Sequence, residues 1–410
     1  AMDVARFGDY ASPQYGTIKS SENYERRFIM TFPNETLPKG RKQKTTALYD
    51  RFVNQGAVMG DSFGLENVLW FANNKEDAHE EPTIKRSRSH DYVSKEVINV
   101  RENVGLIEVA NFSKHEFKGP DARKFLDHIM AGRLPKPGRI SLSPMLSYRG
   151  KLCGDLTVAC LDENEFMVFG SGAAQEMHRR WFESHLDKFN LSYSNRSDEY
   201  HGLSIAGPNS RKVLEKIVRD DVSNEKFKFR DSRRMFVGGV PAIINRISFT
   251  GELGYEIYVA PHYQLKLYEE LMEAGKEFNI KPFGGRALMS MRLEKNWGAW
   301  TLDYRPDFTA KETGLDAFIN WDKEFIGKES AQKENSSNKL VPLIVETNEI
   351  DVTNNEAVLN GDQSIGYVTS GGFAHFVNKS VAFTFVDQKK IKSENKIQVE
   401  INGDLFNCSI

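Results

Sequence analysis

The stretch "HEFKGPDARKFLDHIM" (115–130) has a close echo at 203–218, "LSIAGPNSRKVLEKIV". The Gly-Pro pair, the Arg-Lys pair, a leucine and an isoleucine keep the same positions in both stretches. Each stretch reads as a short strand, a break at Gly-Pro, and a helix whose apolar residues have the spacing of a buried face. An echo at fixed positions predicts that the chain contains two related halves.

The sequence that follows each stretch also repeats in order. A hairpin follows each of them, "LTVACLDENEFMVF" (156–169) and "AIINRISFTGELGYEIYV" (242–259). A helix follows each hairpin, at 173–189 and at 261–274. Strand, helix, hairpin and helix are the components of a ferredoxin-like α+β module. We therefore predict two such modules.

Other parts of the chain have different patterns. Short strands with turn signals at 358–372 and 396–406 predict a C-terminal β-barrel or sandwich. The stretch "SKEVINVREN" (94–103) predicts a helix that ends at Gly105, because glycine is a common helix C-cap. The first eighty residues are rich in aromatics, Gly and Pro, and they predict an irregular segment with short helices.

The composition excludes several classes of protein. The chain has 410 residues, 40% hydrophobic and 27% charged, which is typical of a soluble globular protein. A net charge of −2 argues against a dedicated nucleic-acid binder. The three cysteines, Cys153, Cys160 and Cys408, have no metal-ligand spacing, so we expect no metal and a reducing compartment. No apolar run has transmembrane length, and the start "AMDVARFGDY" does not resemble a signal peptide. We expect a cytoplasmic protein without membrane contact, or a mitochondrial matrix protein in a eukaryote.

Asp155 is the first candidate site residue. It stands in "KLCGDLTVAC" (151–160), directly before an apolar run that predicts a strand. One interpretation makes it a turn residue that binds nearby backbone N–H groups, and spacing alone favours this. The other makes it a carboxylate held at a strand end over a cleft, where it exchanges a proton with an amine.

Glu256 is the second candidate. In "YEIYV" the alternation of a strand puts it on the face opposite Tyr255 and Ile257. On a solvent face it would be an ordinary surface residue, whereas on an inner face it would need hydrogen-bond donors. The planar edge of a pterin offers two adjacent N–H donors that fit a carboxylate side-on. The sequence leaves both possibilities open.

The stretch "FGSGAAQ" (169–175) follows a predicted strand and opens a helix, as a dinucleotide-binding loop does. Gln175 stands where the third glycine of that motif is required, so we reject a Rossmann interpretation. Three short residues at a helix start still allow a ligand to approach backbone N–H groups.

Taken together, the motifs resemble a known family. The run from "GLIEVANF" to "RRWF" (105–182) resembles the folate-binding half of dimethylglycine and sarcosine dehydrogenases. "LSIAGPNSRK", "SFTGELGYEIYV", "SMRLEKNWGAW", "TGLDAF", "FIGKE" and "GYVTSGGF" are similar to that family in the same order, and more distantly to the aminomethyltransferase (T-protein) of the glycine cleavage system. The resemblance covers essentially the whole chain. No glycine-rich FAD fingerprint is present, so we expect FAD only on a fused or partner domain outside this sequence.

The resemblance implies a three-domain aminomethyltransferase-like cloverleaf of the α+β class, with tetrahydrofolate in a central hole. The implied domains are a connecting segment (1–80), folate-binding domain 1 (81–112 and 198–303), ferredoxin-like domain 2 (113–197) and a C-terminal β domain (304–410).

The resemblance also implies roles for individual residues. The catalytic carboxylate of the family falls on Asp155, and its pterin-holding glutamate falls on Glu256. Phe249 takes a position that is often tyrosine in relatives, so an aromatic wall is kept and a hydroxyl contact is lost. Ser171 replaces an asparagine of the T-proteins and still offers a hydrogen bond.

Three further residues complete the folate contacts that the resemblance implies. Ala174 lies at the helix start of 169–175, Tyr255 precedes the pterin-holding glutamate, and Trp297 is suited to lining the pterin or aminobenzoyl ring. Leu288 stands where T-proteins have arginine in an Ala-Arg-Asp motif. That departure favours the dehydrogenase branch over a glycine-cleavage role.

The resemblance implies tetrahydrofolate-dependent one-carbon transfer, in which an iminium or formaldehyde unit from N-methyl amine oxidation becomes 5,10-methylenetetrahydrofolate. The expected partners are the one-carbon donor and a flavin-dependent dehydrogenase domain or subunit. Three alternatives stay open. One is methyl transfer from a sulfonium or methoxy compound, another is a non-catalytic folate-binding regulator, and the third is a module that only docks a flavoprotein. The regulators carry a Lys-Gly-Cys signature that this sequence lacks.

Overall fold

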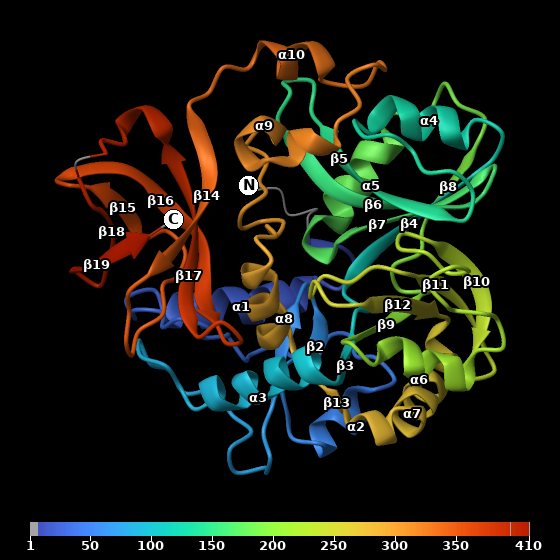
Figure 1. Cartoon of the computed structure of the whole chain (residues 1–410), viewed down its shortest axis with the longest axis horizontal. Helices are drawn as coiled ribbons and strands as arrows, with labels where there is room; N and C mark the ends of the chain where they lie inside the picture. Colours follow the sequence, from blue (N-terminus) through green and yellow to red (C-terminus); the bar gives the residue numbers. More distant parts are fainter. Residues whose placement is uncertain (1–6, 394, 410) are drawn as a thin grey trace. The chain divides into compact units, whose positions relative to one another are not determined.

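The computed structural model describes residues 7–393 and 395–409, and the chain divides into two units. Unit 1 takes the described residues up to His115, together with Ser171–Ser184 and Asn195–Leu288. Unit 2 takes Glu116–Gly170, His185–Ser194 and the described residues from Met289 onward. Each unit therefore gathers segments that are far apart in the sequence (Figure 1).

A six-stranded sheet organises unit 1. In spatial order its strands are β10 (Ser232–Val237), β11 (Val240–Asn245), β12 (Gly254–Val259), β9 (His201–Ala206), β3 (Val104–Glu108) and β13 (Ile280–Pro282). Neighbouring strands are antiparallel except for the parallel pair β13 and β3. Helices α6 (Ser210–Ile217) and α7 (Gln264–Ala274) add Val213, Leu214, Leu267 and Leu271 to the apolar core of this sheet.

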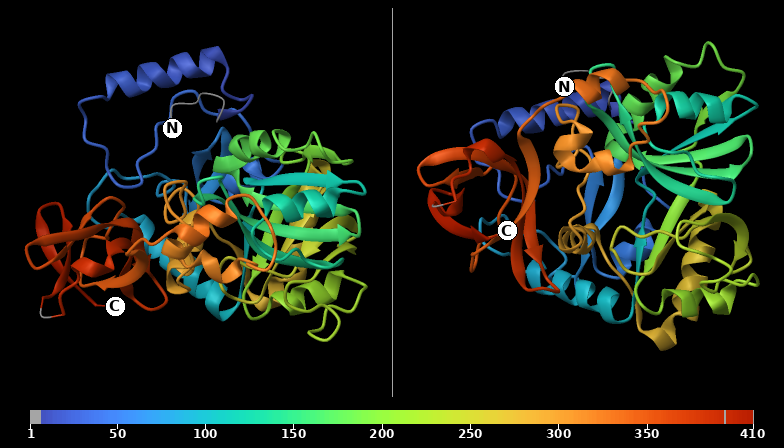
Figure 2. Two further views of the ribbon diagram at one scale, coloured as in Figure 1. Left: turned by 90° about the horizontal axis from the view of Figure 1, so that it is seen from above. Right: turned by 45° about the horizontal axis from the view of Figure 1, so that its top comes forward.

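The remaining elements of unit 1 are mostly N-terminal. They are α1 (Pro13–Glu25), α2 (Tyr49–Asn54), the hairpin of β1 (Ala57–Ser62) and β2 (Leu65–Phe71), α3 (Ser89–Glu102), η2 (Gly172–Ala174), α5 (Gln175–Glu183), η3 (Pro261–Tyr263) and η4 (Lys276–Phe278). Figure 2 shows α1, in dark blue, joined to α2 by a long segment without a named helix or strand. The predicted irregular start with short helices agrees with this arrangement.

The predicted C-cap role of Gly105 is wrong. Helix α3 ends at Glu102 with Asn103 as its C-cap, and Gly105 lies inside β3. A Cβ atom at Gly105 would lie 2.4 Å from Cγ2 of Val100 and 2.6 Å from Cδ1 of Phe283. Glycine is therefore present because β3 passes close to α3, and not because the helix needs a left-handed residue to end.

A five-stranded sheet, most of which belongs to unit 2, carries the first copy of the repeat. Its strands, in spatial order, are β5 (Arg139–Leu146), β6 (Leu152–Asp162), β7 (Glu165–Ser171), β4 (Phe112–Lys118) and β8 (Ser192–Asn195). Helix α4 (Ala122–Ile129) buries the apolar stripe that its spacing predicts, with Phe125, Leu126 and Ile129 at 0% exposure. Strand, helix, hairpin and helix occur in the predicted order.

A closed six-stranded barrel forms the C-terminal part of unit 2. Around the barrel the strands are β14 (Asn338–Val345), β17 (Lys379–Asp387), β16 (Gln363–Ala374), β15 (Ala357–Asn360), β18 (Ile397–Ile401) and β19 (Asp404–Ser409). Figure 2 shows these strands, in orange and red, closing on themselves. Of the predicted barrel or sandwich, the barrel is confirmed.

Short helices precede the barrel: α8 (Gly285–Glu294), α9 (Ala310–Thr313), η5 (Leu315–Phe318) and α10 (Lys328–Lys333). One more, η6 (Gln388–Lys390), lies between β17 and β18. The division into domains that the resemblance implies stays a prediction. The first six residues of its connecting segment lie outside the described residues.

Candidate functional site

Glu256 lies on a central strand of the unit 1 sheet. In β12 it pairs with Asn245 of β11 and with Ser204 of β9. All six residues of β12 are buried, so Glu256 does not stand on a solvent face. Its Oε2 accepts a 2.8 Å hydrogen bond from the hydroxyl of Tyr258, two residues along the strand. No described residue donates to Oε1, which leaves one carboxylate oxygen for a ligand.

The charge of Glu256 depends on three influences. Burial raises its pKa to about 7, while the Tyr258 hydrogen bond and the positive charge of Lys114 act in the opposite direction. Burial also lowers the pKa of Lys114, to about 7. Unit 1 therefore contains a carboxyl group and an amine that both change charge near neutral pH.

Three other predicted residues belong to unit 1. Phe249 is half-buried in the turn that joins β11 and β12, close in sequence to Glu256. Ser171 ends β7 and is half-buried, and Ala174 is buried at the end of η2, where the chain enters α5. The predicted strand end followed by a helix start at 169–175 is present.

Tyr255 has a different environment from its neighbour Glu256. Its side chain is 0% exposed and belongs to the apolar core cluster of unit 1. Its ring stacks on Phe227 with 5.8 Å between centroids and 13° between planes. We therefore assign Tyr255 a packing role, in place of the folate contact that the resemblance implies.

Asp155 is a strand residue of unit 2. It is the fourth residue of β6 and pairs with Pro144 of β5. The preceding turn is closed by a hydrogen bond from the N–H of Gly150 to the carbonyl of Ser147, so the turn ends before Asp155. The structure does not support the interpretation of Asp155 as a turn residue.

The half-buried carboxyl group of Asp155 has few donors around it. Apart from its own backbone N–H, no described group donates a hydrogen bond to it. Burial raises its pKa to about 7. A carboxyl group without fixed donors gains or loses a proton easily near that pH, as a general acid–base group must.

Tyr304 is near two predicted residues. The charge of Asp155 acts on its phenol, and Gly298, the residue after Trp297, donates a hydrogen bond to it. Tyr304 is 4% exposed, and burial together with the negative charge of Asp155 raises the pKa of its phenol. Its oxygen accepts a 3.2 Å hydrogen bond from the N–H of Gly298. A Cβ on Gly298 would lie 2.5 Å from Cζ of Tyr304, so only glycine allows this approach. Trp297, the preceding residue, is half-buried and meets Phe318 edge to face at 6.1 Å.

A buried ion pair fixes the loop that carries Trp297, Gly298 and Tyr304. Nη1 of Arg292 lies 2.7 Å from Oδ2 of Asp303, and the two side chains are 1% and 0% exposed. The same nitrogen donates to the carbonyl of Trp297. On the barrel strand β16, the hydroxyl of Ser370 accepts from Arg292 at 2.9 Å and donates to Asp303 at 2.7 Å.

The predicted residues thus fall into two groups. In unit 2, the phenol of Tyr304 senses the charge of Asp155 and accepts a hydrogen bond from Gly298, the residue after Trp297. In unit 1, Glu256 has Tyr258 and Lys114 as partners, and Phe249, Ser171 and Ala174 belong to the same unit.

Sequence reasoning missed Lys114, Tyr304 and the pair Arg292–Asp303. Only Arg292 carried a signal, because it belongs to the quoted motif "SMRLEKNWGAW". Each of the others gains its position from contacts with residues far away in the sequence.

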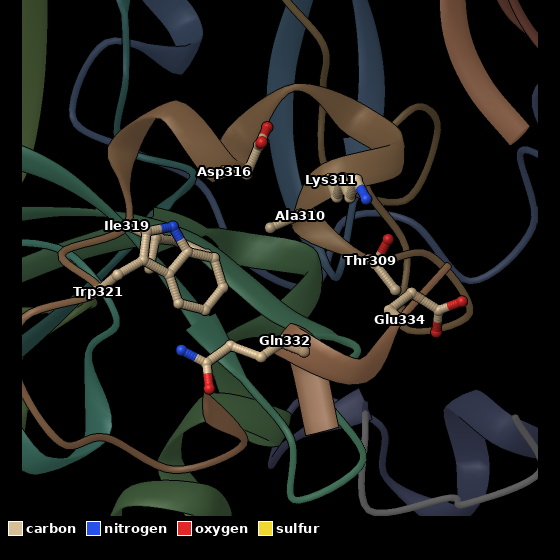
Figure 3. A pocket seen from close by; sticks show the side chains of 9 residues that line it. Thr309, Ala310, Lys311, Asp316, Ile319, Trp321, Gln332 and Glu334 are labelled. Carbon is tan, nitrogen blue, oxygen red and sulfur yellow. The ribbon is translucent and has the colours of Figure 1, made fainter. Parts of the chain in front are cut away.

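Unit 2 also contains a pocket of about 200 Å³ that includes none of the predicted residues. It is lined by Thr309, Ala310, Lys311, Asp316, Ile319, Trp321, Ala331, Gln332 and Glu334. In Figure 3 the carboxylate of Asp316 and the amine of Lys311 point away from the indole of Trp321. These polar groups do not converge on one ligand position.

In residues 7–393 and 395–409, no group of three or more His, Cys, Asp or Glu side chains is arranged to hold a metal ion. Within the same residues, no helix has the length and apolar character needed to cross a membrane.

Comparison with known proteins identifies the family. Residues 48–323 match the GCVT N-terminal domain, and residues 338–410 match the glycine cleavage T-protein C-terminal barrel domain. Residues 1–46 match the FAD dependent oxidoreductase central domain. The matched domains place the chain with the aminomethyltransferases, and its fold is that of an aminomethyltransferase. The chain belongs to the glycine cleavage T-protein family.

Individual relatives agree with this assignment. Mitochondrial dimethylglycine dehydrogenase of Mus musculus is 32% identical over 418 residues, which cover 100% of this chain and 48% of that protein. The chain thus spans about half the length of this curated relative. Aminomethyltransferase of Thermoanaerobacter sp. (strain X514) is 30% identical over 311 residues, covering 74% of this chain and 84% of that protein.

A solved structure supports the fold. The crystal structure of glycine cleavage system aminomethyltransferase T from Bartonella henselae aligns with a TM-score of 0.77 at 22% identity, covering 90% of this chain and 96% of that one. The predicted family and fold class are confirmed.

Proposed function

We propose that this chain captures the one-carbon unit released when an N-methyl amine of the dimethylglycine or sarcosine type is oxidised, and transfers it to tetrahydrofolate as 5,10-methylenetetrahydrofolate. The observation that carries the proposal is the contrast between two carboxyl groups. Burial raises the pKa of both to about 7, but Glu256 has a side-chain donor and a nearby cation, whereas the donor of Asp155 is its own backbone N–H and no cation acts on it among the described residues.

Glu256 fits the role of pterin anchor. Its Oε2 is held by Tyr258, and no described residue donates to Oε1. A buried carboxylate with a free acceptor oxygen suits the adjacent N–H donors of a pterin edge, because charge-assisted hydrogen bonds are the stronger kind. Phe249, half-buried in the turn before β12, supplies an aromatic side chain on the same segment.

Asp155 fits the role of acid–base group. Bound tetrahydrofolate supplies two nucleophilic nitrogens, N5 and N10, that together hold the carbon unit. The carboxylate of Asp155 accepts the proton that the attacking amine loses, and its negative charge stabilises the developing cation. A pKa of about 7 allows Asp155 to take up that proton and release it again near neutral pH.

Tyr304 and Trp297 complete the proposed site in unit 2. The phenol of Tyr304 stays protonated beside Asp155, because burial and the neighbouring negative charge both raise its pKa. Trp297 presents a half-buried indole suited to lining the aromatic part of the folate.

The one-carbon donor is proposed to come from a flavin-dependent N-methyl amine dehydrogenase domain or subunit. The match of residues 1–46 to the FAD dependent oxidoreductase central domain supports this, as do the dimethylglycine and sarcosine dehydrogenases among the relatives. No nucleic-acid partner is proposed.

Product analysis tests the function. A dimethylglycine-oxidising flavoenzyme is supplied with its substrate, and this chain is added with tetrahydrofolate. We expect free formaldehyde to fall and 5,10-methylenetetrahydrofolate to rise faster than in the uncatalysed mixture. A parallel reaction contains a sulfonium methyl donor. Formation of 5-methyltetrahydrofolate from that donor, with no acceleration in the first reaction, overturns the proposal.

A further inference from the structure

Lys114 is a fully buried lysine in the unit that contains Glu256. It lies in β4 between Ser113 and His115, and all three side chains are 0% exposed. Its Nζ donates to the carbonyl of Ala110 at 2.8 Å and to the carbonyl of Ser197 at 3.3 Å. An ammonium group has three N–H donors, and the described residues accept from two of them.

The ammonium of Lys114 is close to the side chain that holds Glu256. Nζ lies 5.9 Å from the ring centroid of Tyr258, within the range of a cation–π contact. The hydroxyl of the same tyrosine donates to Oε2 of Glu256 at 2.8 Å. Tyr258 therefore lies against the cation with its ring and binds the carboxylate with its hydroxyl.

Four charged groups from different segments act on Lys114. The carboxylates of Asp198, Glu108 and Glu256 favour its charged form, and the ammonium of Lys44 disfavours it. Asp198 is 70% exposed and pairs with Lys44 at 3.3 Å, so solvent and its own partner weaken its effect on Lys114. Glu256 is buried and Glu108 is half-buried, so both are better shielded from solvent than Asp198.

Glu108 and Glu256 differ in their neutral partners. Glu108 accepts hydrogen bonds from the side chains of Gln264 and Thr46, and Gln264 in turn contacts His201. Glu256 has only the Tyr258 hydroxyl. A buried carboxylate with one neutral donor stays ionised only if a positive charge is near. Among the groups that act on Glu256, Lys114 is the positive one.

We propose that Lys114 is a positioning residue for folate, whose buried ammonium holds Glu256 in the ionised form that receives the pterin N–H groups. This inference rests on the proposed function of Glu256 as the pterin anchor. The proposal predicts a folate affinity that depends on pH in the neutral range. Lys114 changes this affinity through Glu256 and does not contact the reacting carbon.

The test is K114M, which keeps the aliphatic stem and removes the charge. Binding of 5-formyltetrahydrofolate, a stable reduced folate with the same pterin edge, is measured by calorimetry between pH 6 and 8.5. Without the cation the pKa of Glu256 rises, so its carboxylate ionises only at higher pH. At pH 7 we expect K114M to bind the folate about fivefold to tenfold more weakly than the wild type does. At pH 8.5 we expect its affinity to be less than about twofold weaker.

A matched control and a double variant separate this role from a structural one. Lys323 of unit 2 also donates to two backbone carbonyls, those of Asp127 and Met130, and is mostly buried. K323M is expected to lower stability and to leave the pH profile of binding unchanged. E256Q is expected to bind weakly with an affinity that no longer depends on pH, so its loss relative to wild type should be larger at pH 8.5 than at pH 6. K114M/E256Q is expected to bind no worse than E256Q.

Different failures have different meanings. If the wild-type chain binds no folate, the proposed function fails. If the wild type binds and K114M shows the wild-type profile, or the same loss at every pH, the role of Lys114 is overturned. If K114M does not fold, K114Q is tested in its place, because it keeps an N–H donor without the charge, and it is expected to show the same pH shift.

Discussion

The two copies of the repeat carry a carboxylate in different surroundings. In the first copy Asp155 lies in β6, the first strand of the hairpin, and in the second copy Glu256 lies in β12, the second strand. Burial raises the pKa of both to about 7. Tyr258 and Lys114 accompany Glu256, whereas Asp155 has only its own N–H as a donor and a protonated phenol, that of Tyr304, nearby.

This difference indicates how one scaffold supports two functions. A carboxylate with fixed partners is held in one orientation and is suited to binding. A carboxyl group without such partners changes charge at low cost and is suited to proton transfer. Substitutions at the two positions should therefore have opposite signatures.

The largest effect is expected for D155N. Asparagine has nearly the same shape as aspartate but does not take up a proton, so formation of 5,10-methylenetetrahydrofolate should slow by about 10²–10⁴-fold. Folate affinity should change by only a small factor. The rate is measured with saturating tetrahydrofolate, and affinity by calorimetry. If D155N keeps the full rate and melts at a lower temperature than the wild type, Asp155 stabilises the fold and is not the acid–base group.

The next largest effect is expected for R292M. Removing one partner of a buried ion pair leaves an uncompensated charge, here that of Asp303, and should cost about 3–5 kcal/mol of the free energy of unfolding. Urea denaturation measures it. The double variant R292M/D303L removes both charges and should recover part of the loss. If R292M costs less than about 1 kcal/mol, the pair does not hold the loop of Tyr304.

E256Q should weaken binding more than it slows chemistry. Glutamine places a donor where the pterin N–H groups need an acceptor, which should cost about 1–3 kcal/mol of binding free energy. The rate at saturating folate should stay near that of the wild type. E108Q is the matched control, because Glu108 is a second carboxyl group of unit 1 whose pKa burial raises to about 7. Equal affinity losses in E256Q and E108Q would remove the special role of Glu256.

The last prediction concerns the pH dependence of stability and needs no folate. The folded-state pKa of Asp155, about 7, lies above that of an unfolded aspartate, so the folded chain binds more protons between about pH 4 and 7. This group therefore lowers stability as pH rises through that window. D155N should melt at a higher temperature than wild type at pH 8 and at a similar temperature at pH 4. Identical differences at both pH values would contradict the raised pKa.

Much of the fold could be predicted from local pattern. The echo between 115–130 and 203–218 predicted two modules, and the turn-rich C-terminal stretches predicted the barrel. Gly105 was mistaken for a helix cap, because its actual cause is the close packing of Val100 and Phe283 against β3, and Phe283 is far away in the sequence.

The candidate site was predicted less completely. Motifs drew attention to Asp155 and Glu256, but the residues that set their charge were not visible. Lys114 matters because the fold buries it beside Tyr258, and Tyr304 matters because its phenol lies close to Asp155. The resemblance implied a folate contact for Tyr255, whereas the strand alternation put it on the face opposite Glu256, where it packs in the apolar core.

The hydrogen bonds from β16 to Asp303 limit how far this enzyme can be shortened. A chain that stopped before residue 338 would still contain Asp155, Glu256 and the sequences of both modules. It would lose the hydroxyl groups of Ser370 and Thr369, which donate to Asp303 inside unit 2. The loop of Tyr304 would then lose part of its anchor. A minimal engineered version must therefore retain the barrel, although the barrel contains none of the residues proposed to touch folate.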